Sequence, residues 1–178
     1  NHFFREKMQN IYITGTGFWI PEDGLTTNDE VVNSYNTFVD NFNASNAEAI
    51  SLGSIEAMSH SSSEFIEKAS GIKTRYLFDK HNCLDPNRMK PKTRPELSDN
   101  TSILAEMGIE SAKMAIENAG ITADEIDGII LGTSHSARNY PAIAIEIQEA
   151  LGVNGYAYDM LVGCSSTTFA ISNAFSDI

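Results

Sequence analysis

The sequence predicts an α/β fold, and the evidence lies in the second half of the chain. From residue 101 onward the patterns alternate: a helix over 101–119, a strand over 128–134, a helix over 141–151 and a strand over 156–162. Strands that alternate with helices in this way pair in parallel, and each intervening helix forms a right-handed crossover. The continuous apolar run G-I-I-L-G-T-S at 128–134 is typical of a strand with helices on both faces.

Composition favours one ordinary globular domain. The 178 residues are 42% hydrophobic and 20% charged, and no apolar run reaches eighteen residues. The first ten residues lack the apolar core of a secretory signal, so we expect a cytoplasmic protein with no membrane association. A net charge of −12 argues against a nucleic-acid partner. With no internal repeat and no low-complexity linker, residues 1–178 are expected to form one unit.

The first part of the chain begins with a β-rich run. Asn10 to Thr14 predicts a short strand, and G-T-G at 15–17 predicts a tight turn. T-N-D-E at 27–30 is a capping box, in which a hydroxyl and a carboxylate each bind a free backbone N–H at a helix start. It predicts a helix to about Phe42, followed by a loop with a weak helix over 43–60.

Further caps mark the next elements. S-S-S-E at 61–64 is a second capping box, and Gly71 suits the left-handed position that ends its helix. Residues typical of strands recur at every second position over 72–78, at Ile72, Thr74 and Tyr76, which predicts a strand. Gly120 closes the helix over 101–119, and T-A-D-E at 122–125 is a third capping box on a short turn.

The later elements lead to the second cysteine. Pro141 suits the first position of the helix over 141–151, and Gly152 suits its end. The strand over 156–162 is expected to be buried. A last helix should begin at about Cys164.

A basic segment interrupts this acidic chain. Four of the twelve Lys and Arg residues fall in R-M-K-P-K-T-R at 88–94, where Pro91 and the nearby Pro95 prevent a regular helix. The segment is either a solvated loop or a docking patch for a phosphorylated or acidic partner. The sequence leaves both interpretations open.

The two cysteines stand in different contexts. Cys83 forms H-x-C with His81, but no second pair at zinc spacing exists, so we expect no metal site and no disulfide framework. Cys164 follows an apolar run and Gly163, at the carboxyl edge of the predicted sheet, where α/β proteins place their ligands. Free N–H groups and the helix dipole there favour a thiolate. A buried filler remains the alternative to a nucleophile.

Several motifs, in order, resemble the N-terminal half of β-ketoacyl-acyl-carrier-protein synthase III, one of the thiolase-like condensing enzymes. They are I-T-G-T-G-F-W-I-P, S-G-I-K-T-R-Y, I-D-G-I-I-L-G-T-S-H-S, Y-P-A-I-A-I-E-I-Q-E-A-L-G and D-M-L-V-G-C. The resemblance implies one half of a thiolase-like fold, with a mixed, largely parallel sheet and helices on both faces. It also implies that residues 1–178 form the half that carries the nucleophile, with the C-terminal half absent.

The resemblance implies a fatty-acid-initiating acyltransferase. Cys164 would accept an acyl group from acyl-CoA, and malonyl-acyl-carrier protein would lose CO₂ and attack the thioester. No cofactor is implied beyond these substrates. The family's histidine and asparagine for decarboxylation lie in its second half, and none of the four histidines here matches that half. This chain alone should therefore acylate itself slowly at most, and the complete protein should be a homodimer.

The resemblance also assigns three substrate-binding residues. Tyr140 matches an aromatic residue that reaches across the dimer interface into the partner's acyl pocket, although it could simply be a helix-entry aromatic. Phe65 matches a tryptophan that stacks on the CoA adenine, but Ala69 stands where the family has a basic residue. Ser166 and Thr167 replace the family's frequent Gly-Phe, so we expect a roomier acyl channel and a primer longer than acetyl.

Other functions remain open from the sequence. Condensing enzymes of polyketide or hydrocarbon synthesis use an equivalent cysteine. A non-catalytic acyl-binding partner is a further alternative, although such a protein would not need the thiol of Cys164.

Overall fold

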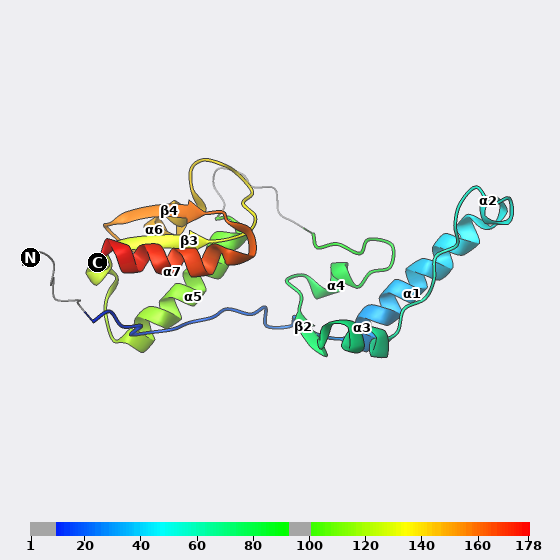
Figure 1. Ribbon diagram of the computed structural model, residues 1–178, viewed down its shortest axis with the longest axis horizontal. Helices are drawn as coiled ribbons and strands as arrows, with labels where there is room; N and C mark the ends of the chain where they lie inside the picture. The colour runs from blue at the N-terminus through cyan, green and yellow to red at the C-terminus, as the bar shows by residue number, and fades with distance from the viewer. Residues whose placement is uncertain (1–9, 93–100) are drawn as a thin grey trace, which may run out of the picture. The chain divides into compact units, whose positions relative to one another are not determined.

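The computed structural model describes residues 10–92 and 101–178, and these residues fall into two compact units (Figure 1). We call residues 10–19 with 101–178 the sheet unit and residues 20–92 the α1 unit. The sequence shows no linker composition at either boundary, so this division comes from the contacts alone.

The α1 unit begins with a small antiparallel sheet. Strand β1 (Leu25–Thr27) pairs with β2 (Thr74–Tyr76), which is shorter than the predicted strand over 72–78. Helix α1 (Asn28–Ser45) starts from the predicted capping box: the Thr27 N–H donates to Glu30 at 2.8 Å, and the Glu30 N–H donates to the Thr27 hydroxyl. This prediction is confirmed, and α1 ends at Ser45 rather than at Phe42.

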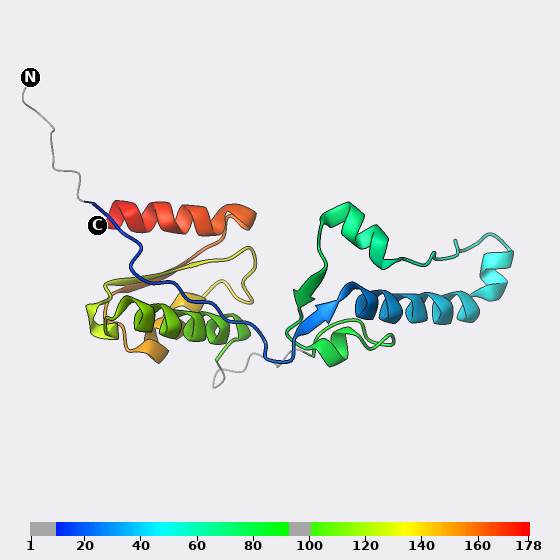
Figure 2. The same cartoon turned by 90° about the horizontal axis from the view of Figure 1, so that it is seen from below.

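Three short helices complete this unit (Figure 2). They are α2 (Ala47–Ser51), α3 (Ser63–Ser70) and α4 (Lys80–Cys83). Helix α2 is the weak helix expected within 43–60. Helix α3 is capped by Ser62, whose hydroxyl accepts from the Phe65 N–H, so the capping box predicted on Ser61 is wrong by one residue. Gly71 ends α3 at a φ of 73°, as predicted.

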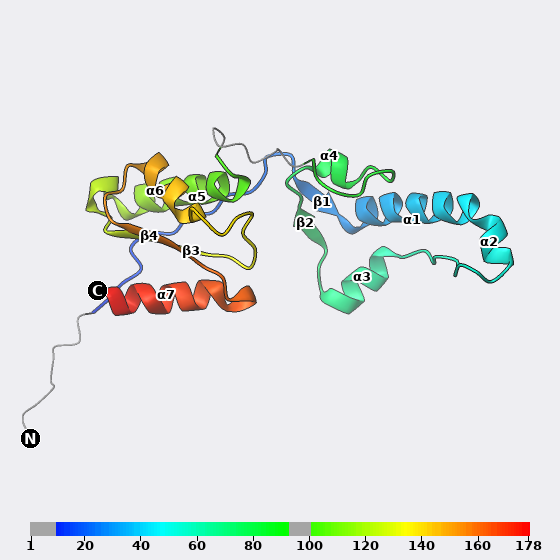
Figure 3. The same ribbon diagram turned by 90° about the horizontal axis from the view of Figure 1, so that it is seen from above.

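The sheet unit is built on two parallel strands. Strand β3 (Gly128–Gly132) pairs with β4 (Tyr156–Met160), with Ile130 opposite Tyr158. Helices α5 (Ile103–Ala119) and α6 (Ile143–Leu151) cover one face, and α7 (Ser166–Asp177) covers the other (Figure 3). The predicted parallel pairing and the helices on both faces are confirmed.

Both strands are shorter than predicted. Leu161 and Val162 lie beyond the end of β4 and are about half exposed, so the strand is not buried over 156–162. The capping box of Thr122 and Glu125 is confirmed on a 3₁₀ turn at Ala123–Glu125, and Gly120 ends α5 in the left-handed region.

An apolar core holds α5 and α6 against the sheet. Ala105 and Ile109 from α5 pack with Ile143 and Ile147 from α6, and each is at most 8% exposed. Full burial of one isoleucine side chain contributes about 2 kcal/mol. This core covers the face of the β3–β4 sheet that lies opposite α7.

The prediction of a strand and a turn near the start is wrong. Residues 10–19 form no strand, and Tyr12 and Ile13 are 73% and 77% exposed because no strand in the described chain pairs with them. Gly15 and Gly17 instead lie on the backbone of α5, where an added Cβ would come within 2.2 Å of the Ala115 carbonyl or 2.1 Å of the Ser111 carbonyl. These glycines therefore permit close packing rather than a tight turn.

No helix in the described parts of the chain has both the length and the hydropathy to cross a bilayer.

Candidate active site

Cys164 lies where strand β4 gives way to helix α7. A 3₁₀ turn at Gly163–Ser165 joins the two elements, and Gly163 adopts a left-handed φ of 61°. Cys164 is exposed among the residues that the structure describes. The predicted strand-to-helix junction at the carboxyl edge of a parallel pair is therefore confirmed, and α7 begins two residues later than expected.

Ser166 holds this turn from the inside. It is 2% exposed, and its hydroxyl accepts a hydrogen bond from the Val162 N–H at 2.9 Å. The same oxygen lies 2.8 Å from the Thr133 carbonyl and 2.8 Å from the Gly163 carbonyl, either of which can accept its proton. One buried hydroxyl thus links the end of β3 to the turn that carries Cys164.

Asp159, in β4, caps the N-terminus of α6. Its carboxylate accepts from the Ile143 N–H and the Ala144 N–H, both at 2.8 Å. These N–H groups belong to residues with no solvent exposure. This arrangement explains why α6 begins at Ile143, and the prediction that Pro141 takes the first helical position is wrong.

A partly buried ion pair connects the loop before α6 to the start of α5. Arg138 binds one oxygen of Glu146, and the Arg138 Nε donates to the Pro141 carbonyl at 2.8 Å. The other oxygen of Glu146 accepts from the Ser102 N–H at 2.7 Å. This loop carries Tyr140, whose side chain is 85% exposed in the described chain.

The other predicted site residues occupy different surroundings. Thr167, the second residue of α7, is exposed and lies within one helical turn of Cys164. Phe65 is 66% exposed on α3, in the α1 unit. It lines an apolar cavity of about 580 Å³ with Val31, Tyr35 and Met89. Cys164, Thr167 and Tyr140 belong to the sheet unit.

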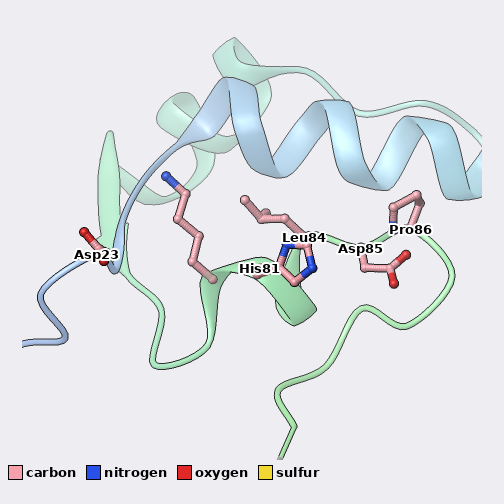
Figure 4. Close-up of a pocket in the computed structure, with 6 residues that line it drawn as sticks. Asp23, His81, Leu84, Asp85 and Pro86 are labelled. Atoms are coloured by element: carbon pink, nitrogen blue, oxygen red, sulfur yellow. The ribbon is translucent and has the colours of Figure 1, made fainter.

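A second cavity in the α1 unit is lined by charged side chains (Figure 4). It measures about 630 Å³, and Figure 4 shows His81 and Leu84 between Asp23 on one side and Asp85 on the other. Lys80 also lines it. No group of three metal-ligating side chains occurs within residues 10–92 or 101–178.

Cys83 contrasts with Cys164 in its surroundings. Cys83 ends α4 and is partly buried, and this burial, with the negative charge of Asp79, raises the pKa of its thiol. A raised pKa leaves less thiolate at neutral pH, which disfavours Cys83 as a nucleophile.

The described part of the basic segment is an exposed loop. The Arg88 guanidinium donates to the carbonyls of Lys90 and Pro91, and the Lys92 N–H donates to Asp79 at 2.8 Å. Arg94 and Pro95 lie outside the described residues. The choice between a solvated loop and a docking patch stays a prediction.

The sequence did not reveal the structural roles of Asp159, Ser166 and Arg138. A signal existed for Asp159, since a lone carboxylate within Y-A-Y-D-M is unusual in a strand that packs against helices. Ser166 carried no such signal, because a serine after a turn is ordinary.

The fold of the chain is similar to that of thiolase-like enzymes. The priming β-ketosynthase of the R1128 polyketide pathway matches 93% of this chain with a TM-score of 0.62 and 20% identity, over 36% of its own length. The 3-oxoacyl-[acyl-carrier-protein] synthase III of Aquifex aeolicus matches 91% of it with a TM-score of 0.59 and 24% identity, over 38% of its length. The predicted thiolase-like fold class is confirmed.

Sequence comparison narrows this class to one family. The chain is 51% identical over 145 residues to a β-ketodecanoyl-[acyl-carrier-protein] synthase of Pseudomonas aeruginosa, which covers 82% of this chain. It is 32% identical over 121 residues to a β-ketoacyl-[acyl-carrier-protein] synthase III of Agrobacterium fabrum. The chain spans 41% and 31% of the lengths of these relatives. No protein-family model matches it. The recognition from the motifs is confirmed: this chain belongs to the β-ketoacyl-acyl-carrier-protein synthase III family.

Proposed function

We propose that this chain supplies the nucleophile of a condensing enzyme that joins an acyl-CoA primer to malonyl-acyl-carrier protein. The observation that carries the proposal is the position of Cys164. An exposed thiol stands at the carboxyl edge of a parallel strand pair, in a turn that leads into a helix. The identity to a β-ketodecanoyl-[acyl-carrier-protein] synthase supports the same reading.

The first step is acyl transfer to sulfur. The Cys164 thiolate attacks the thioester carbonyl of acyl-CoA, and the C–S bond to CoA breaks as the tetrahedral intermediate collapses. CoA leaves as a thiolate and takes up a proton from solvent. The Cys164 N–H, at the turn before α7, is the proposed donor to the oxyanion.

The second step forms the carbon–carbon bond. Malonyl-acyl-carrier protein loses CO₂, and the resulting carbanion attacks the acyl-cysteine carbonyl. The C–S bond breaks, Cys164 is released as thiolate, and a β-ketoacyl-acyl-carrier protein leaves. The histidine and asparagine implied by the family resemblance would assist this step from the remainder of the protein.

The proposed primer is longer than acetyl. The Pseudomonas aeruginosa relative is named for a ten-carbon β-keto product, and condensation with malonyl adds two of those carbons, so an eight-carbon primer fits. The small exposed Thr167, one turn from Cys164, leaves more room than the aromatic residue frequent in the family. Phe65 remains the proposed stacking partner for CoA, and Tyr140 the proposed contact across a homodimer.

A primer panel tests this function. The full-length protein is given malonyl-acyl-carrier protein and acyl-CoAs of two to twelve carbons, and β-ketoacyl product is measured by mass spectrometry. We expect the highest kcat/KM near eight carbons, and Cys164→Ser should lower turnover by about 10³-fold or more. Cys83→Ser is the matched control and should leave turnover unchanged. A clear preference for acetyl-CoA would contradict the primer assignment, and full activity of Cys164→Ser would contradict the function.

A further inference from the structure

We infer that Ser166 is a positioning residue for Cys164. Its hydroxyl fixes the turn at Gly163–Ser165 to the carboxyl end of β3, so that the Cys164 sulfur meets the acyl carbonyl in one orientation. This inference rests on the proposed function for its consequence in catalysis. The hydrogen bonds of Ser166 can be tested without that function.

The first support is the number of groups that one buried hydroxyl contacts. Ser166 accepts from the Val162 N–H on the near side of Cys164 and can donate to the Thr133 carbonyl on β3. It also lies 2.8 Å from the Gly163 carbonyl, within the turn itself. The residues on either side of Cys164 are thus tied to a strand, while Cys164 itself stays exposed.

The second support is the close approach of backbone to backbone. An added Cβ at Gly132, the last residue of β3, would lie 2.9 Å from the Ser166 carbonyl carbon and 3.0 Å from the Thr167 nitrogen. The first residues of α7 are therefore packed directly on the end of β3.

The third support is the contrast with its neighbour. Ser165 is exposed, and its side chain makes no hydrogen bond to any residue that the structure describes. Ser165 and Ser166 are the same residue type, and both lie within two positions of Cys164. Only Ser166 is placed to control the turn.

This arrangement has a consequence for acyl transfer. A nucleophile that is held in a reactive orientation gains rate because orientational freedom is removed before the reaction. Loss of the Ser166 hydroxyl would leave the thiol exposed and chemically competent but free to adopt unproductive orientations. The rate at saturating acyl-CoA should then fall, while acyl-CoA binding should not.

The experiment compares Ser166→Ala and Ser166→Gly with Ser165→Ala in the full-length protein. We expect the single-turnover rate of Cys164 acylation by octanoyl-CoA to fall about tenfold in both Ser166 variants, with the half-saturating concentration unchanged. Alkylation of Cys164 by iodoacetamide, which needs no oriented site, should stay at the wild-type rate. Ser165→Ala should match the wild type in both reactions.

Hydrogen exchange provides the readout that does not depend on acyl transfer. The Val162 amide should exchange about fivefold faster in the Ser166 variants, the factor that one typical hydrogen bond is worth. Wild-type exchange at Val162 or wild-type acylation in the Ser166 variants would overturn the positioning role. Equal losses of acylation, alkylation and thermal stability would also overturn it, because they indicate general damage. Absence of acylation in the wild-type protein would refute the proposed function alone.

Discussion

The carboxylate of Glu30 serves two elements at once. It closes the start of α1 by accepting from the Thr27 N–H, and it binds the Lys80 ammonium of α4 at 2.6 Å. The Lys80 and Glu30 side chains are 29% and 40% exposed, so solvent screens the pair only in part. The hydrogen bond from Lys80, followed by that from Thr27, lowers the pKa of Glu30 to about 2.

This lowered pKa makes a prediction for Lys80→Met. The Glu30 pKa should rise toward its ordinary value of 4.5, as followed by carboxyl carbon chemical shifts during an acid titration. Because the folded-state pKa lies below the unfolded value, the ionised Glu30 stabilises the fold above about pH 4.5, and this contribution is lost as the pH falls toward 2. Lys80→Met should therefore destabilise the protein most near neutral pH, and the difference from wild type should shrink in acid.

Lys73→Met is the control for this titration. Lys73 pairs with Glu67, and their side chains are 75% and 51% exposed. The Glu30 titration should be unchanged in that variant. A Glu30 midpoint that is the same in wild type and in Lys80→Met would contradict the account of this pair.

Residues whose partners are close in sequence were the ones that could be predicted. Thr27 with Glu30, and Thr122 with Glu125, bind each other across three residues, so their spacing alone reveals the cap. Asp159 binds N–H groups fifteen and sixteen residues away, and Ser166 binds Thr133 thirty-three residues away. Such contacts depend on the packing of the sheet, which local spacing does not specify.

Helix α6 shows how the start of a helix can be determined by a residue on another element. Its first N–H groups are satisfied by a carboxylate on β4 rather than by a local cap, since Ala142 has no side-chain oxygen. The predicted start at Pro141 failed for this reason. By contrast, α1 and α5 carry their own caps in Thr27 and Ser102. The cap and start of α1 were predicted from the sequence, whereas the Ser102 cap was not, and α5 begins two residues later than expected.

This difference gives a prediction for Asp159→Ala. Two buried N–H groups at the start of α6 would lose charge-assisted hydrogen bonds, and the free energy of unfolding should fall by about 3 kcal/mol, as measured by urea denaturation. Asp124→Ala is the matched control, because Asp124 is an exposed carboxylate in a turn of the same unit. Equal stability of the two variants would contradict the external cap.

In residues 10–14 the sequence predicted an element that the structure does not form. Residues 10–14 have a strand-like composition but form no strand, because a strand requires a neighbour and none in the described chain lies beside them. Gly15 and Gly17 were read as a turn, yet their role is close contact with α5. Composition indicates the local preference for a strand, whereas strand pairing depends on which other segments of the molecule lie alongside.

At the scale of the whole molecule, order along the chain was the strongest predictor. Alternating helices and strands after residue 101 correctly indicated parallel pairing and helices on both faces. The division into two units was not predicted, because the sequence contains no low-complexity linker. The position of Cys164 at a sheet edge and the identity to a condensing enzyme converge on the proposal that Cys164 is the nucleophile.

The most direct test of this convergence is to locate the acyl group. The full-length protein is incubated with octanoyl-CoA without malonyl-acyl-carrier protein, digested, and mapped by mass spectrometry. Cys83 serves as an internal control, since its burial raises its thiol pKa. We expect a thioester-linked octanoyl group on the peptide that contains Cys164, lost when malonyl-acyl-carrier protein is added, with Cys83 unmodified. An octanoyl group on Cys83, or none on Cys164, would contradict this proposal.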